Sequence, residues 1–293
     1  MARSRTSAGQ VAGRGVVAVK KKVALLAVLA LVLAACVPGV KKPEPPQARV
    51  EGFDLISVDP FSGEARFALR LRVTNPNAFE LPLLESRLAL TFDRARLPFD
   101  LPAVTLPPAG FEVVETRVTV PLTESAEGVG KLLRGEAVRL RVDGRVRVQV
   151  GPVPLDLGPF TLFDETVRVD LRFAWPRFEL DPQQSRLSLS GGRLEVVVGF
   201  RVANPNPVGF YLRGPVALRV GGRSVAEATL DMPLRPRQTG SGALAFRVDL
   251  AHVPGAAAAL VSGLPVELAG AVRAEVPGVW QTLLDVAFGG RVR

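Results

Sequence analysis

The chain has 293 residues, of which 47% are hydrophobic, and a formal net charge of +9. This hydrophobic content excludes a disordered, hydrophilic chain, and the length suits two domains of about 110–125 residues each behind a leader. One cysteine and one histidine exclude a disulfide scaffold and the usual zinc ligand sets.

The N-terminal segment has the pattern of an export signal. Three lysines, Lys20–Lys22, precede an unbroken apolar run of 13 residues, Val23–Ala35, and Cys36 follows. This order is typical of a secretory signal, and the run is too short to span a bilayer comfortably as a helix. The residues Leu33–Cys36 resemble a bacterial lipobox, which implies cleavage before Cys36 and acylation of that residue. An uncleaved signal anchor is the alternative.

Removal of residues 1–35 changes the charge of the chain. The leader carries six basic residues and no acidic one, so the mature 258 residues have a formal charge of +3. The mature chain is therefore not a nucleic-acid binder on charge alone. Residues 36–49 combine the lipidated Cys36 with a proline-rich tether. In proteobacterial lipoproteins an aspartate after the cysteine favours inner-membrane retention. Val37 stands there, so we expect the periplasmic face of the outer membrane rather than the inner membrane.

One pattern occurs twice in the mature chain. Residues 67–77 read FALRLRVTNPN and residues 196–206 read VVVGFRVANPN, and Asn75 and Asn204 lie 129 residues apart. In the first copy Phe67, Leu69, Leu71 and Val73 alternate with Ala68, Arg70, Arg72 and Thr74, which predicts a strand with one buried face. The second copy keeps the buried set in register as Val196, Val198, Phe200 and Val202. A repeat of this period is the size of a domain, so we expect domains at 50–171 and 172–293.

An Asn-Pro-Asn motif ends each of these strands: Asn75, Pro76 and Asn77 in the first copy, and Asn204, Pro205 and Asn206 in the second. The residue before a proline stays extended, the proline favours a turn, and Asn77 tolerates the left-handed conformation. The motif therefore predicts a strand-ending turn. A binding role for the asparagine side chains is the alternative.

The remaining elements of the first domain alternate with turn signals. We expect a short helix over Thr123–Leu133, with Thr123 as its cap, Glu124 and Glu127 near its N-terminus and Gly135 at its end. Asp93 and Pro98 are expected to interrupt the strands. The predicted strands, besides 67–74, are 53–58, 83–92, 97–101, 112–120, 138–150 and 166–173.

The second domain repeats this order. A hairpin is predicted around Gly221 and Gly222, and Pro254–Ser262 is the counterpart of the short helix. The predicted strands, besides the repeated one, are 178–180, 216–220, 224–228, 244–250, 266–276 and 280–288. No flexible linker separates the two domains. The fold class is therefore all-β, with two tandem immunoglobulin- or fibronectin-III-like β-sandwich domains, each with one short helix, behind a lipoprotein signal peptide.

The repeated strand, the V-x-N-P-N motif and the apolar pair that follows it (Phe79 and Leu81; Phe210 and Leu212) resemble a known family. This is the late-embryogenesis-abundant type 2 family, also called the WHy (water stress and hypersensitive response) domain. The resemblance covers both repeats. It implies a small β-sandwich and an association with desiccation and other stress, and it brings no catalytic residues.

Candidate chemistry is sparse. The only histidine, His252, has no nucleophile motif such as G-x-S-x-G beside it, and no Walker loop or dinucleotide fingerprint occurs. We therefore expect no enzyme, no cofactor and no metal. Outward arginines of the first domain are candidate contacts for an anionic surface if their strands are neighbours, with a solvated face as the alternative. They are Arg70, Arg72, Arg139, Arg141, Arg145 and Arg147.

These observations predict a non-enzymatic, lipid-anchored envelope protein. It would protect stress-labile proteins or an anionic membrane surface during desiccation or related stress, with no nucleic acid and no small molecule as partner. The alternative is a structural adaptor that docks an envelope protein complex, since a β-sandwich hosts many functions.

Overall fold

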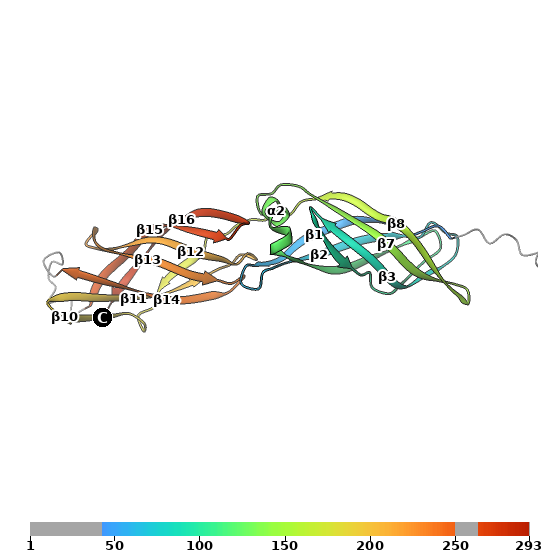
Figure 1. The fold of residues 1–293 in the computed structure, drawn as a ribbon. Helices are drawn as coiled ribbons and strands as arrows, with labels where there is room; N and C mark the ends of the chain where they lie inside the picture. The colour runs from blue at the N-terminus through green and yellow to red at the C-terminus, as the bar shows by residue number, and fades with distance from the viewer. Residues whose placement is uncertain (1–42, 250–262, 293) are drawn as a thin grey trace, which may run out of the picture. The chain divides into compact units, whose positions relative to one another are not determined.

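The structure is a computed structural model that describes residues 43–249 and 263–292 (Figure 1). The predicted signal, Cys36, His252 and the predicted helix at 254–262 lie outside these ranges. Within them the chain is built from antiparallel strands and one α-helix. The all-β prediction is therefore confirmed, and the expected domain boundaries stay predictions.

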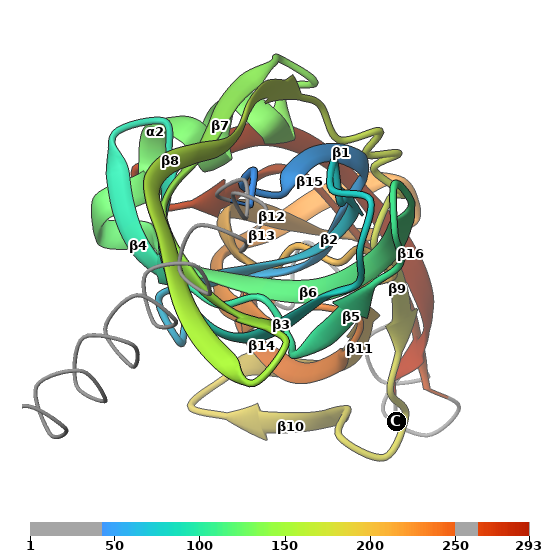
Figure 2. The same cartoon turned by 90° about the vertical axis from the view of Figure 1, so that its right-hand side faces the viewer.

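The first half of the described chain forms two sheets, which together with α2 are called the first sandwich. One sheet has the order β1-β2-β6, and the other has the order β4-β3-β7-β8, with β5 also paired to β3. Figure 2 shows the two sheets as separate curved layers. The elements are β1 (Gln47–Asp59), β2 (Glu64–Thr74), β3 (Leu81–Phe92), β4 (Ala95–Phe99), β5 (Val104–Leu106), β6 (Phe111–Pro121), α2 (Leu122–Leu133), β7 (Val138–Val150) and β8 (Val153–Val167).

The second half forms the second sandwich, also from two sheets. One sheet has the order β10-β11-β14, with β9 also paired to β11, and the other has the order β13-β12-β15-β16. The elements are β9 (Arg177–Leu180), β10 (Arg186–Ser190), β11 (Arg193–Ala203), β12 (Phe210–Val220), β13 (Arg223–Leu234), β14 (Thr239–Asp249), β15 (Leu264–Val276) and β16 (Trp280–Val292).

The two sandwiches share one connectivity. In each, the strand before the Asn-Pro-Asn motif (β2 or β11) is central in one sheet, and the next long strand (β3 or β12) is an inner strand of the other sheet. The repeated strand is β2 in the first sandwich, where Phe67, Leu69, Leu71 and Val73 are fully buried. Alternation with period 2 therefore places one face of the strand in the core, as the sequence predicts.

The helix α2 begins one residue earlier than predicted and has a different cap. Its N-cap is Pro121, without any side-chain cap bond, so the expected role of Thr123 is wrong. Its end agrees with the prediction: Gly135 has φ +75°, and its N–H donates to the carbonyl of Leu132 (3.0 Å). A left-handed residue after the last turn is the usual glycine stop of a helix.

Two edge strands depart from the prediction. Pro98, expected to break a strand, lies inside β4, and the last strand of the first sandwich is β8 rather than 166–173. Both strands stand at the ends of their sheet. Proline is tolerated there because its missing N–H has no ladder partner, and β8 accordingly contains Pro154 and Pro159.

Candidate functional site

The first Asn-Pro-Asn motif holds three chain segments together through buried amides. Asn75 Nδ2 donates to the carbonyls of Phe79 (2.7 Å) and Pro107 (3.0 Å). Asn75 Oδ1 accepts the backbone N–H (3.0 Å) and the Nδ2 (2.9 Å) of Asn77. Asn77 in turn pairs with the backbone of Glu44, whose N–H donates to Oδ1 and whose carbonyl accepts from Nδ2, both at 2.9 Å. The motif therefore fixes the chain that enters the first sandwich.

The second motif makes the same set of bonds. Asn204 Nδ2 donates to the carbonyls of Val208 (2.8 Å) and Arg235 (3.0 Å). Its Oδ1 accepts the backbone N–H and the Nδ2 of Asn206, both at 3.0 Å. Asn206 pairs with the backbone of Ala174 through two bonds of 2.7 Å. Ala174 belongs to the segment between the sandwiches, so this motif fixes that connection.

At each motif, a residue in the left-handed conformation lies in the loop that faces the motif and not in the motif itself. We expected Asn77 to tolerate the left-handed conformation, but Asn77 does not have a positive φ. The positive φ values belong to Ala109 (+47°) and Arg237 (+52°). The N–H of Ala109 donates to the carbonyl of Asn77 (2.7 Å), and the N–H of Arg237 donates to that of Asn206 (2.9 Å). Every buried side-chain polar atom of the described residues has a partner. This geometry favours the structural role of the motif over ligand binding by its amides.

The candidate arginines do not share one sheet. Arg70 and Arg72 lie on β2, whereas Arg139, Arg141, Arg145 and Arg147 lie on β7 of the other sheet. The condition for one continuous basic face, that these strands are neighbours, is not met. Arg72 instead forms an ion pair with Glu51, and its guanidinium carbon lies 4.1 Å from the centroid of the Phe111 ring.

Carboxylates neutralise most of the charge on β7. Three guanidinium groups donate through Nε to a neighbouring carboxylate: Arg139 to Asp164 (2.7 Å), Arg141 to Asp143 (2.8 Å) and Arg147 to Asp156 (2.9 Å). These hydrogen bonds hold the pKa of each of the three carboxyls below its usual range. Arg145 has no ion pair within the described ranges. The exposed face of β7 therefore carries mainly ion pairs, and each exposed ion pair stabilises the fold little.

The hairpin end between β1 and β2 contacts the second Asn-Pro-Asn motif. Val58 donates its N–H to the carbonyl of Pro207 (2.9 Å) and accepts the N–H of Gly209 (2.7 Å), as in a short parallel bridge with Val208. Val58 and Val208 are both buried. Two backbone bonds and two buried apolar side chains thus join the two sandwiches.

Polar and aromatic contacts extend this junction. Arg235 lies 3.5 Å from a carboxylate oxygen of Asp59, and its guanidinium carbon lies 5.6 Å from the centroid of the Phe61 ring. The rings of Phe61 and Tyr211 meet edge to face at 5.0 Å. Such geometry is preferred because the ring edge is positive and the ring face is negative.

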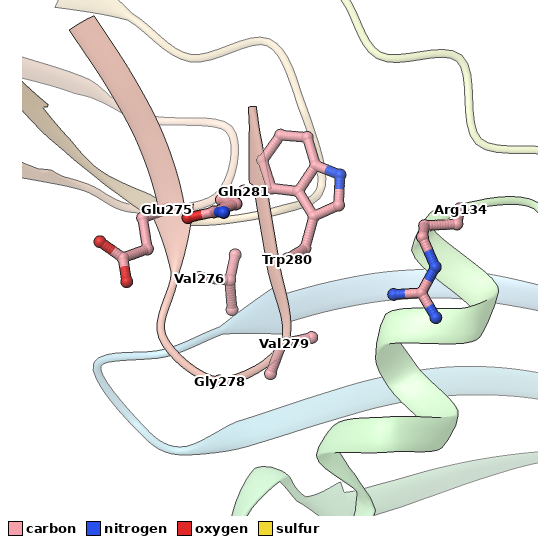
Figure 3. A pocket seen from close by; sticks show the side chains of 7 residues that line it. All are labelled: Arg134, Glu275, Val276, Gly278, Val279, Trp280 and Gln281. Atoms are coloured by element: carbon pink, nitrogen blue, oxygen red, sulfur yellow. The ribbon is translucent and has the colours of Figure 1, made fainter. Parts of the chain in front are cut away.

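A pocket of about 380 Å³ lies where α2 faces the turn between β15 and β16 (Figure 3). Arg134, at the end of α2, stands on one side, and the β15–β16 residues, which include Val279 and Trp280, stand on the other. Arg134 Nε donates to the Glu136 carboxylate (2.6 Å). The helix lies so close to this turn that a Cβ on Gly130 would meet the carbonyl oxygen of Val279 at 2.6 Å. The residues that line this pocket include no two groups placed to act together as a general acid and a general base.

Residues 70–157 match the family model LEA_2, described as Late embryogenesis abundant protein. This range contains the first Asn-Pro-Asn motif and runs from β2 into β8. The match confirms the resemblance to the late-embryogenesis-abundant type 2 family for the first sandwich. The second motif lies outside the matched residues, so a second LEA_2 copy stays a prediction.

Three solved structures are similar to the chain at low identity. A protein from Archaeoglobus fulgidus is 13% identical, with 45% of this chain and 100% of that chain covered and a TM-score of 0.26. Red sea bream transglutaminase is 11% identical over 82% of this chain and only 31% of its own length, with a TM-score of 0.26. A protein of unknown function from Porphyromonas gingivalis W83 is 14% identical over 83% and 99%, with a TM-score of 0.21. No curated protein matches the sequence.

The LEA_2 match supports a stress-related protein and fits the expectation that the chain is not an enzyme. Among residues 43–249 and 263–292, no three His, Cys, Asp or Glu side chains form a group that could hold a metal ion. In the same ranges, no helix is both long and apolar enough to cross a membrane.

Sequence reasoning missed the partners of the motif. Glu44 falls in the predicted tether, yet Asn77 binds its backbone, and β1 begins at Gln47 rather than near Phe53. Nothing in the residue types of Glu44 or Ala174 marks them, because only their backbone groups take part. The spacing is a usable signal. Glu44 lies 33 residues before Asn77, and Ala174 lies 32 residues before Asn206.

Proposed function

We propose that this protein is a non-enzymatic, lipid-anchored envelope protein that protects proteins or membrane during desiccation or related stress. The observation that carries the proposal is the LEA_2 match over a folded sandwich whose motif amides are all engaged inside the fold. A protein of this kind acts as a stable surface rather than through a reactive site.

The internal hydrogen bonds of the motif support a protective protein that stays folded when water is scarce. A buried amide that bonds to backbone carbonyls needs no water to satisfy it. Both sandwiches have such amides at the same place, and all six motif bonds of Asn204 and Asn206 are made within the chain. Loss of water therefore leaves these polar groups paired.

The anchor is part of the proposal. The lipobox-like residues before Cys36 support acylation of that cysteine, and Val37 after it supports the periplasmic face of the outer membrane. Mass spectrometry of the protein purified from membranes tests this step. Acyl groups on an N-terminal Cys36 are expected, and an intact leader would contradict the anchor.

Protection is tested on a labile enzyme that is dried or frozen with the chain from Val37, produced without lipid. An inert protein of equal mass is the control. We expect more recovered activity than in the control at up to equimolar ratio. Recovery equal to the control would contradict the protective role and favour a structural adaptor, for which a stoichiometric envelope partner would be sought by co-purification.

A further inference from the structure

The Asn-Pro-Asn ends of the two sandwiches differ in what covers them. Asn75 and Asn204 make equivalent bonds, to the carbonyls of Phe79 and Val208 respectively. Val208 is 1% exposed because it lies against Val58 of the first sandwich, whereas Phe79 is 37% exposed. The equivalent loop of the first sandwich therefore carries a large aromatic side chain that is only partly covered by the described residues.

Two further apolar side chains lie beside this loop, on β6. Phe111 is 47% exposed and Val113 is 48% exposed, and they are cross-strand partners of Thr74 and Arg72 on β2. The strand β6 stands at the end of its sheet. The term end patch is used below for Phe79, Phe111, Val113 and the Arg72 guanidinium that lies over the Phe111 ring.

The chain before the first sandwich enters at this same end. Asn77 binds the backbone of Glu44 through two hydrogen bonds, next to Asn75 and its bond to Phe79. Glu44 is eight residues after Cys36. Eight extended residues span at most about 29 Å, so an acylated Cys36 keeps the end patch near the bilayer. This step rests on the proposed lipid anchor.

We infer that the end patch contacts the phospholipid surface in which the protein is anchored. Aromatic rings favour the interface between headgroups and acyl chains because one part of that region is apolar and the other is polar. Arg72 is already paired with Glu51, so the positive charges that add to the patch are those of Lys41 and Lys42, which precede Glu44 in the sequence. These charges complement anionic headgroups. Exposed apolar side chains of this kind commonly mark a contact surface.

The test uses the full acylated chain with one introduced cysteine. The sequence has a single cysteine, and acylation occupies its thiol, so Phe79→Cys or Phe111→Cys supplies the only free thiol. Each is labelled with an environment-sensitive dye in vesicles of neutral and anionic phospholipids that carry a nitroxide quencher. Leu283→Cys is the matched control, since Leu283 is 66% exposed on β16 of the second sandwich.

We expect strong quenching of the dye at positions 79 and 111, and little at position 283. Anchored protein without quenching at 79 and 111 would overturn the contact and leave the anchor intact. Equal quenching at all three positions would also overturn it, because the contact would not be specific. Disulfide dimers of Phe111→Cys without quenching would assign the patch to a second copy of the chain. Protein without acyl groups on Cys36 would contradict the anchor and remove the bilayer as occupant.

Discussion

The side-chain amide of Asn206 pairs with both backbone groups of Ala174, each through a hydrogen bond of 2.7 Å. The amide thereby takes the place of a neighbouring strand for one residue of the connection between the sandwiches. Asn77 does the same for Glu44. The motif is therefore a device that fixes the chain segment entering each sandwich.

Replacement of Asn75 or Asn204 by alanine should destabilise the protein strongly. Each change leaves two backbone carbonyls and one backbone N–H without their partner, and a buried unsatisfied group costs about 1–3 kcal/mol. We expect a loss of about 3 kcal/mol or more in urea unfolding. The control is Gln149→Ala, whose amide bonds to Gly151 at the surface and which should change stability by less than ~0.5 kcal/mol. Equal effects would contradict the proposed role of the motif.

The junction at Val58 and Val208 should couple the unfolding of the two sandwiches. Val208→Arg places a charge in a buried contact, and an unpaired buried charge is strongly unfavourable. Calorimetry should show one transition for the native chain and two for this variant. Val153→Arg, at a position 58% exposed, should keep one transition. A single transition in both variants would show that the coupling lies elsewhere.

Gly130→Ala tests the contact between α2 and the β15–β16 turn. Alanine favours a helix over glycine by about 1 kcal/mol, yet its Cβ would meet the Val279 carbonyl at 2.6 Å. We expect a net destabilisation of up to about 2 kcal/mol, since overpacking costs about 1–3 kcal/mol against the gain in helix propensity. Thr123→Ala is the control because Thr123 is exposed and is not the cap. A stabilised Gly130→Ala variant would contradict the close contact.

Acid should weaken the β7 ion pairs. Hydrogen bonds from arginines lower the folded-state pKa of Asp143, Asp156 and Asp164, so these groups stabilise the fold above the usual carboxyl pKa of about 4. That contribution is lost as the pH falls through the lowered folded-state pKa. We expect the melting temperature of the triple Asp→Asn variant to fall less on acidification than that of the native chain. High salt should reduce the difference, because exposed pairs are screened.

The positions of most strands could be predicted from the sequence, and the reason is local. Alternation in Phe67–Thr74 and turn signals such as Gly221–Gly222 act within a few residues, and β2 and the β12–β13 hairpin follow them. The prediction failed at β8, where Pro154 and Pro159 indicate a loop. The strand β8 tolerates these prolines because it stands at the edge of its sheet, and neighbouring residues do not show that position.

The sequence by itself determined the all-β class, the repeated strand and the place of each Asn-Pro-Asn motif, because alternation and turn chemistry are properties of short segments. Only the tertiary structure decided that Arg72 and Arg139 lie on different sheets, that Asn206 binds Ala174 and that Val58 covers Val208 while Phe79 stays exposed. The contacts of Ala174 and of Val58 join residues far apart in the chain through backbone groups. Such groups are the same in every residue type, so packing and strand register alone select the partners.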